Sequence, residues 1–257
     1  MKPSALNTNR DSWDQRTAEH VHSRFYDVAG FLAGNSSLNP LDRTEVGEVS
    51  GLSMLHLQCH FGLDTLSWAR LGARVCGLDF SPEAIERARE LAQQAGIDAQ
   101  FVCADVYDTA QHVGQFDRVY SSYGVLEWLP DMRRWAQVVA TALKPGGVLN
   151  LIEFHPYSYA LDGDAYFNGG QPQLINERSY TENAAEVLPL YVWSHPVSDV
   201  VNALLGAGLE LLHLNEYAYS PYNCFEGLIE REPGHYVRAD SASDVPMLYS
   251  IKARKPE

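Results

Sequence analysis

The stretch Ser53–Ser81 constrains the fold most, because it predicts a strand, a tight turn, a helix and a second strand in direct succession. Ser53–Leu57 and Arg74–Leu78 are short apolar runs, which are typical of buried parallel strands. Leu63–Leu71 lies between them, places leucines on one helical side and is followed by a glycine, which favours a helix end there. The stretch therefore predicts one right-handed β–α–β unit.

Two features of this unit indicate a ligand-binding edge. The turn Gln58–Gly62 leads into a helix N-terminus, where backbone N–H groups point outward and attract polar or anionic groups. Asp79 ends the second strand, and a carboxylate at that place can accept hydrogen bonds from the two hydroxyls of a ribose. We therefore expect a nucleoside-binding crevice where this turn and Asp79 meet.

The remaining chain continues the alternation of strands and helices. Further strands are predicted at Asp98–Cys103, Gln115–Ser122, Val148–Phe154, Leu209–Tyr217 and Val245–Ala253. Further helices are predicted at Pro82–Ala95, Asp131–Leu143 and His195–Ala207, with a turn at Lys144–Gly147. This order is typical of an α/β fold with an open, mostly parallel sheet that is covered on both faces and ends in an antiparallel strand.

Three segments stand outside that alternation. Residues 1–45 precede the sheet as an aromatic arm, in which Trp13–Phe31 predicts one or two helices; the arm either packs against the domain or forms a lid over the crevice. Residues 46–257 form the main domain, within which 155–194 and 219–244 are rich in Tyr, Pro, Gly and Asn and show little periodicity. We expect these two insertions to form a cap.

Composition excludes several classes of function. The 257-residue chain has a net charge of −14 and no basic run, which argues against a nucleic-acid partner. Its apolar runs are too short to cross a membrane, and the polar N-terminus lacks the apolar core of a signal peptide. The four cysteines show no CxxC spacing, so we expect small buried thiols in a cytoplasmic protein, monomeric or homodimeric.

Several catalytic and nucleotide motifs are absent from the sequence. There is no GxxxxGK[ST], no GxSxG and no HExxH, and His56 and His60 lie in a strand and a turn rather than on one helical face, so no metal site is expected. The turn after the first strand also lacks GxGxxG, which a dinucleotide pyrophosphate needs for close backbone approach. The class of ligand that remains is a nucleoside without a pyrophosphate.

At this point the chain resembles the class I S-adenosylmethionine (SAM)-dependent methyltransferases. The resemblance rests on five motifs in order: LHLQCHFG (Leu55–Gly62) where the family has an LDLGCGTG-like loop, VCGLDFSP (Val75–Pro82), CAD (Cys103–Asp105), FDRV (Phe116–Val119) and LKPGG (Leu143–Gly147). LQCHFG looks like a version of the loop found in bacterial small-molecule methyltransferases. The resemblance implies a Rossmann-like seven-stranded sheet, SAM as cofactor and a small organic methyl acceptor.

The resemblance also implies which residues hold SAM. The expected cofactor-binding residues are Gln58, Cys59, His60 and Gly62 in the loop, Asp79 at the ribose, Phe80, Asp105 and Val106 at the adenine, and Ser121 at the methionine part. The chain departs from the family pattern at three loop positions, where His56, Gln58 and His60 replace an acid and two glycines. The larger side chains at 58 and 60 would narrow the space near the methionine part.

Residues after the fourth and fifth strands are candidates for the acceptor side. The expected catalytic residues are His155, Glu127 and Tyr123, and the expected substrate-binding residues are Tyr26, Trp128 and Tyr157. Methyl transfer mainly needs an oriented acceptor and a dry site, with a base only where the acceptor must lose a proton. Two other functions stay open: an NAD(P)-dependent oxidoreductase, and a non-catalytic binding protein with the SAM fold.

Overall fold

A seven-stranded sheet forms the centre of the protein, in a computed structural model that describes residues 4–239 and 244–257. Residues 1–3 of the expected arm and 240–243 of the expected cap lie outside the described residues. The spatial order is β3 (Gln100–Cys103), β2 (Arg74–Asp79), β1 (Ser53–Leu57), β4 (Phe116–Ser122), β5 (Leu143–Phe154), β11 (Leu248–Arg254) and β8 (Glu210–Tyr217). Only β11 runs opposite to the other six strands of this sheet, so the predicted fold class is confirmed.

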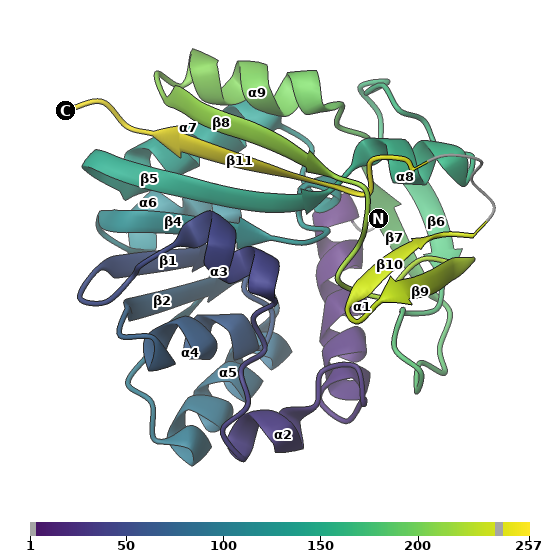
Figure 1. Cartoon of the computed structure of the whole chain (residues 1–257), viewed down its shortest axis with the longest axis horizontal. Helices are drawn as coiled ribbons and strands as arrows, with labels where there is room; N and C mark the ends of the chain where they lie inside the picture. Colours follow the sequence, from purple (N-terminus) through teal and green to yellow (C-terminus); the bar gives the residue numbers. More distant parts are fainter. Residues whose placement is uncertain (1–3, 240–243) are drawn as a thin grey trace.

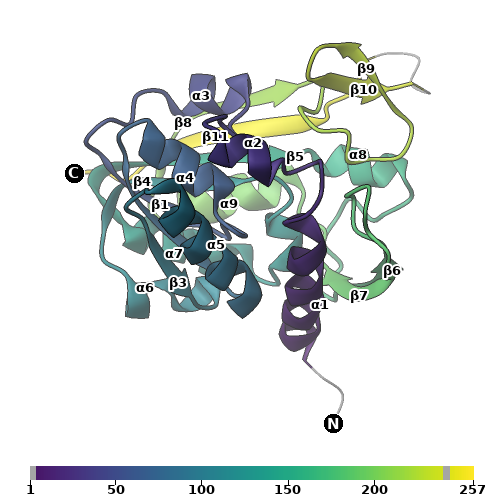
Figure 2. The ribbon, with the colours of Figure 1, turned by 90° about the horizontal axis from the view of Figure 1, so that it is seen from below.

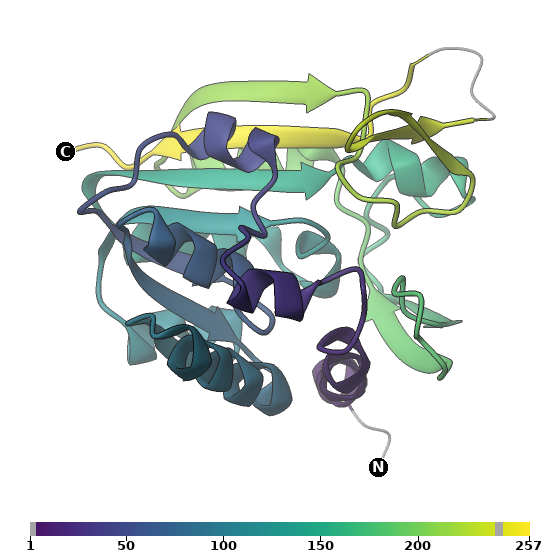
Figure 3. The ribbon, with the colours of Figure 1, turned by 60° about the horizontal axis from the view of Figure 1, so that its bottom comes forward.

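Helices cover both faces of this sheet, as Figure 3 shows. One face carries α6 (Thr109–His112), α7 (Met132–Ala142) and α9 (Val197–Gly206). The other carries α3 (Pro40–Val46), α4 (Leu63–Arg70) and α5 (Pro82–Ala95). Side chains alternate between the two faces along β1, so this strand contributes to both core layers. Leu55 and Leu57 pack toward the α7 side, and Met54 packs toward the α3 side.

Local sequence signals explain where α5 begins and ends. The Ser81 hydroxyl accepts a hydrogen bond from the backbone N–H of Ala84 at 3.0 Å, and Pro82 occupies the first helical position. Gly96 closes the helix in the left-handed conformation with φ of 65°, which glycine adopts without a steric penalty. The helix therefore starts directly after Asp79, at the carboxyl edge of the sheet.

The N-terminal segment crosses that edge. It contains α1 (Ala5–His20) and α2 (Val28–Leu32) ahead of α3. In Figures 1 and 2, α1 stands across the arrowhead ends of the parallel strands and separates them from the strands beyond. It packs against both α5 and β7, so the arm connects the sheet side with the first insertion.

The two insertions are more regular than the sequence indicates. The first contains α8 (Pro156–Leu161) and the antiparallel pair β6 (Gln173–Glu177) and β7 (Leu188–Val192); the second contains the antiparallel pair β9 (Leu228–Glu232) and β10 (His235–Arg238). Residues of β6 and β9 are largely exposed, so neither strand has the alternation of buried and exposed residues that predicts one. Short 3-10 helices follow β3 and β4, η1 (Val106–Asp108) and η2 (Leu126–Trp128).

Two expectations are corrected. β5 starts at Leu143 rather than Val148, because Leu143 pairs with Phe116 and a register irregularity takes up the glycines that predict a turn. Cys103 is exposed rather than buried, because β3 is the edge strand of the sheet. Among the helices within the described residues, none is long and apolar enough to cross a membrane.

Candidate active site

The turn after β1 keeps the backbone of a glycine-rich loop without most of the glycines. Gln58, His60 and Gly62 all have left-handed φ angles, of 54°, 51° and 80°. Such angles are costly for residues with a Cβ and are typical of functional turns. A Cβ on Gly62 would lie 2.7 Å from the Phe101 ring, so glycine is required there. The chain therefore forms a left-handed turn here although two of these three positions are not glycine.

The larger loop side chains point away from the turn itself. The Gln58 amide donates to the Val125 carbonyl at 2.8 Å. The His60 ring lies against α1, with Nε2 at 2.8 Å from Nδ1 of His20 and Nδ1 at 3.5 Å from the Thr17 hydroxyl. His56 is turned to the other side of the strand, where its Nδ1 lies 2.8 Å from the Thr65 hydroxyl.

Asp79 lies at the end of β2 with its carboxylate directed to this turn. The backbone N–H groups of His60 and Ser81 donate to its two oxygens at 2.8 and 3.0 Å. Each oxygen keeps capacity for a further donor. The side chain is 7% exposed, and burial raises its pKa to about 6, against the lowering effect of those hydrogen bonds.

The adenine-side candidates lie beside it. Asp79 is paired with Cys103 across β2 and β3, so the ends of the two strands are adjacent. Asp105 begins η1, and one of its carboxylate oxygens accepts from the Tyr107 N–H at 2.9 Å. Val106 is buried as the first residue of η1, and Phe80 is half-buried next to Asp79.

Two buried polar atoms near this edge lack partners. Neither the Ser121 hydroxyl nor Oε1 of Gln58 has a hydrogen-bond partner among the described residues. Ser121 stands beside Leu57 in the β1–β4 register, so the two atoms belong to adjacent strand ends. A buried polar atom without a partner costs about 1–3 kcal/mol, which a polar ligand could recover.

Helix α1 forms hydrogen bonds with this edge on one of its sides. The Asp14 carboxylate accepts from the Ser81 hydroxyl, and also from the Glu83 N–H at 3.3 Å. His20 is fully buried, and burial together with the charge of Arg16 lowers its pKa to about 3. The rings of His20 and His60 are therefore neutral at physiological pH, and one donates to the other.

On its other side α1 is bonded to the first insertion. Asn9 exchanges two hydrogen bonds with the backbone of Tyr191, at 2.8 and 2.7 Å, and the Ser12 hydroxyl donates to the Pro189 carbonyl at 2.6 Å. Arg16 forms an ion pair with Glu177 of β6 at 3.2 Å. The helix thus joins the loop after β1 to β6 and β7.

Aromatic side chains from all three irregular segments meet near the turn after β1: Phe25 contacts Tyr180 at 5.1 Å and Tyr222 at 5.5 Å, and Tyr26 contacts His60 at 5.5 Å between ring centroids. Trp13 contacts Trp128 at 5.4 Å between ring centroids, and Tyr26 stacks on His20 at 5.1 Å. The predicted substrate residues Tyr26 and Trp128 belong to this aromatic cluster. The third, Tyr157, lies on α8 with 40% of its surface exposed, and the structure does not bring it there.

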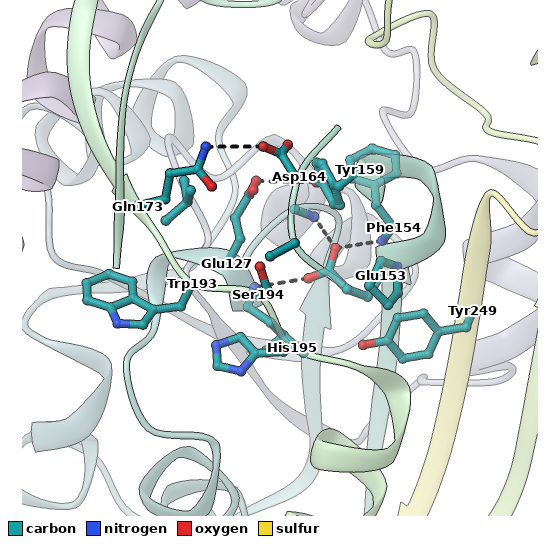
Figure 4. A pocket seen from close by; sticks show the side chains of 15 residues that line it. Glu127, Glu153, Phe154, Tyr159, Asp164, Gln173, Trp193, Ser194, His195 and Tyr249 are labelled. Carbon is teal, nitrogen blue, oxygen red and sulfur yellow. Dashed lines mark hydrogen bonds between the residues drawn. The ribbon is translucent and has the colours of Figure 1, made fainter. Parts of the chain in front are cut away.

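A cavity opens between the ends of β4 and β5 and the first insertion (Figure 4). Its floor is shaped by Glu153, which accepts the backbone N–H groups of Gly124, Val125 and Leu126 after β4. Glu127 also faces the cavity, and its carboxylate accepts a hydrogen bond from the Tyr159 hydroxyl at 3.3 Å. Burial, and then the charge of Glu153, raises the pKa of Glu127 well above its usual range.

The other two predicted catalytic residues are engaged elsewhere. Nδ1 of His155 accepts from the Tyr157 N–H at 3.1 Å, and its Nε2 lies 3.0 Å from Glu216, so the ring caps α8. The Tyr123 hydroxyl donates to the buried Asp42 at 2.7 Å. Of the three candidates, Glu127 is the one whose ionisable group faces the cavity. Sequence reasoning missed Tyr159, which lies in a segment without periodicity.

Comparison with known proteins identifies a domain family in the stretch that contains the turn after β1 and the ends of β2, β3 and β4. Residues 54–147 match a family described as a methyltransferase domain. The chain is 33% identical over 149 residues to a ubiquinone biosynthesis O-methyltransferase of Escherichia coli O157:H7, covering 56% of this chain and 62% of the relative. It therefore spans less than two thirds of that relative's length.

A second relative and a solved structure match more of the chain at lower identity. The tRNA 5-carboxymethoxyuridine methyltransferase of Escherichia coli K12 is 24% identical over 203 residues, 76% of this chain and 77% of the relative. The crystal structure of a SAM-dependent methyltransferase from Mesorhizobium loti superposes with a TM-score of 0.57 at 23% identity, over 87% of this chain and all of that one. That likeness concerns the fold.

Proposed function

We propose that this chain, which carries a class I SAM-dependent methyltransferase domain, transfers a methyl group from SAM to a small organic acceptor. The observation that carries the proposal is the carboxyl edge of β1, β2 and β4. There a left-handed loop, a buried carboxylate and two unpartnered polar atoms lie together, within the stretch that matches the domain family.

The residues at this edge fit the chemistry of SAM. Asp79 is suited to accept from the ribose hydroxyls, with Phe80, Asp105 and Val106 beside the adenine. The unpartnered atoms of Gln58 and Ser121 are suited to the polar methionine part. Bound SAM supplies a methyl group on a positively charged sulfur, which makes that carbon an electrophile.

The chain's own contribution is orientation and exclusion of water. α1 and the two insertions close the carboxyl edge, and the aromatic cluster offers flat apolar walls for an acceptor. In this proposal residues 4–45 form the lid that the sequence suggests as one of two possibilities. Glu127 faces the cavity and is placed to hold an acceptor or take its proton.

A small acceptor is favoured over a nucleic acid, although one relative is named as a tRNA methyltransferase. The net charge of −14 would repel a polyanion, because binding to phosphates depends on Lys and Arg. An oxidoreductase is disfavoured because the loop lacks GxGxxG, which a dinucleotide pyrophosphate needs for close backbone approach.

Calorimetry and a turnover screen test the proposal together. S-adenosylhomocysteine (SAH), the demethylated product, should bind with a micromolar dissociation constant, and NAD(P)H should not bind. A screen of fractionated cell extract should contain a component that drives SAM consumption. A dissociation constant for SAH above the millimolar range would refute the assignment of the cofactor site.

A further inference from the structure

The cavity beyond β4 and β5 has a marked charge imbalance. Three acids line it, namely Glu127, Glu153 and Asp164, whereas none of the described residues that line it is a lysine or an arginine. His195 is the remaining titratable base, and its Nε2 bonds the Leu129 carbonyl at 2.7 Å while burial lowers its pKa. The cavity therefore presents carboxyl groups without a fixed positive partner in its described wall.

Of the three acids, Glu127 keeps unused capacity inside the cavity. Glu153 is saturated by backbone N–H groups, and Asp164 is exposed and accepts from Gln173 at 3.3 Å. Glu127 accepts from the Tyr159 hydroxyl at 3.3 Å, and Figure 4 shows these two side chains directed toward each other at the cavity. The charge of Arg16 acts on Glu127, but Arg16 is held by Glu177 in an ion pair at 3.2 Å.

The cavity walls suit an organic cation as well. Tyr159 and Trp193 line it, and Phe225 packs on the Tyr159 ring at 5.6 Å between centroids. Aromatic faces attract ammonium groups, and they do so most strongly where water is excluded. A half-buried carboxylate beside aromatic rings is suited to recognise amines.

From this geometry we infer that the methyl acceptor is an amine on a small apolar or aromatic body, bound through its nitrogen to Glu127. The inference rests on the proposed function and adds the acceptor class to it. The net charge of −14 favours the approach of a cation to the protein. A carboxylic acid would instead place a second negative charge beside Glu127.

The transfer balances with Glu127 as proton acceptor. The acceptor enters as an ammonium ion and gives one proton to the Glu127 carboxylate, which frees the nitrogen lone pair. That nitrogen forms a bond to the methyl carbon as the carbon–sulfur bond breaks, and the sulfur keeps the bonding electrons as a neutral thioether. The nitrogen then carries the positive charge, and the proton on Glu127 passes to water when the site opens. The raised pKa of this carboxyl makes it a better proton acceptor.

Binding of a probe cation tests the inference without turnover. Phenyltrimethylammonium and its uncharged isostere tert-butylbenzene are titrated into the SAH-bound protein, and into the Glu127→Gln and Glu186→Gln variants. Glu186 is an exposed glutamate in the same insertion and serves as the matched control. We expect the cation to bind at least about tenfold more tightly than the isostere, and Glu127→Gln alone to remove that preference.

A turnover panel of phenethylamines, matched phenols and matched carboxylic acids adds the second readout. Methylation confined to the amines, and lost in Glu127→Gln while SAH binding is retained, supports the inference. Equal binding of cation and isostere, or methylation confined to the phenols or acids, overturns it and leaves the proposed function standing. Failure of SAH itself to bind overturns the proposed function as well.

Discussion

Asp79 gives a quantitative prediction for cofactor binding as a function of pH. Burial raises its pKa to about 6, so the carboxylate is ionised near pH 8 and about nine-tenths protonated near pH 5. A ribose diol donates to the ionised form, so SAH should bind about tenfold more weakly near pH 5 than near pH 8. His20 and His60 do not interfere, because burial lowers the pKa of both below this range.

The assay is calorimetric titration of SAH at several pH values, for the parent protein and for Asp79→Asn. The variant should bind roughly 10- to 100-fold more weakly near pH 8, because it loses charge-assisted hydrogen bonds, and its affinity should not change with pH. The matched control is Asp98→Asn, an exposed carboxyl ahead of β3, which should behave as the parent. A parent affinity that is constant from pH 5 to 8, or an Asp79→Asn variant that binds normally, would refute the ribose assignment.

The same pKa has a consequence for stability without ligand. The folded-state pKa lies above the ordinary value of 3.8, so protonated Asp79 stabilises the fold below that pH, and this stabilisation is lost as pH rises through about 6. The shift corresponds to about 3 kcal/mol. The thermal stability of the ligand-free parent should therefore decrease between about pH 4 and pH 7 more than the thermal stability of Asp79→Asn does.

Three further predictions follow from single contacts. Gly62→Ala should lower the unfolding free energy by roughly 2–4 kcal/mol in denaturant titrations, because the added methyl would lie 2.7 Å from Phe101 at a left-handed φ; unchanged stability would contradict the tight approach. His20→Ala should raise the SAH dissociation rate roughly tenfold in stopped-flow experiments, because it frees α1 from the turn after β1; an unaltered rate would argue against the lid. Hydrogen bonds from Ser53 hold the pKa of Asp117 well below its usual range. Ionised Asp117 therefore stabilises the fold above that range, and this stabilisation is lost in acid. Because the group is partly exposed, Asp117→Asn should cost only about 1 kcal/mol near pH 7 and less near pH 3, as thermal melts can check.

Much of the cofactor edge can be predicted from sequence because its positions follow from strand ends. Parallel strands finish at one edge, so an acid directly after β2 and another after β3 must be neighbours, as the pairing of Asp79 with Cys103 shows. The left-handed angles at Gln58 and His60 could not be predicted from residues that disfavour them. They follow from the short connection between β1 and α4. In the sequence, only the resemblance to a glycine-rich loop indicates such a turn.

The proposed acceptor side cannot be predicted from sequence in the same way, because its contacts join segments that are far apart in the chain. Glu127 meets Tyr159 across 32 residues, and Asn9 meets Tyr191 across 182. His155 and Tyr123 have the right position after a strand, yet Glu216 and Asp42 take up their polar atoms. Hydrophobic periodicity does not encode such contacts. The chemical type of the residues was therefore not enough to distinguish Glu127, which faces the cavity, from His155 and Tyr123, which do not.

By itself the sequence determined the order of strands and helices in the central sheet, the antiparallel last strand and the edge where we propose that a nucleoside binds. Each of these depends on local apolar periodicity and on the geometry that parallel strands share. The tertiary structure alone decided that α1 crosses that edge and that the half-buried Glu127 faces a cavity whose described wall has no lysine or arginine. Those outcomes depend on which distant side chains satisfy one another, and that is set only when the whole chain packs.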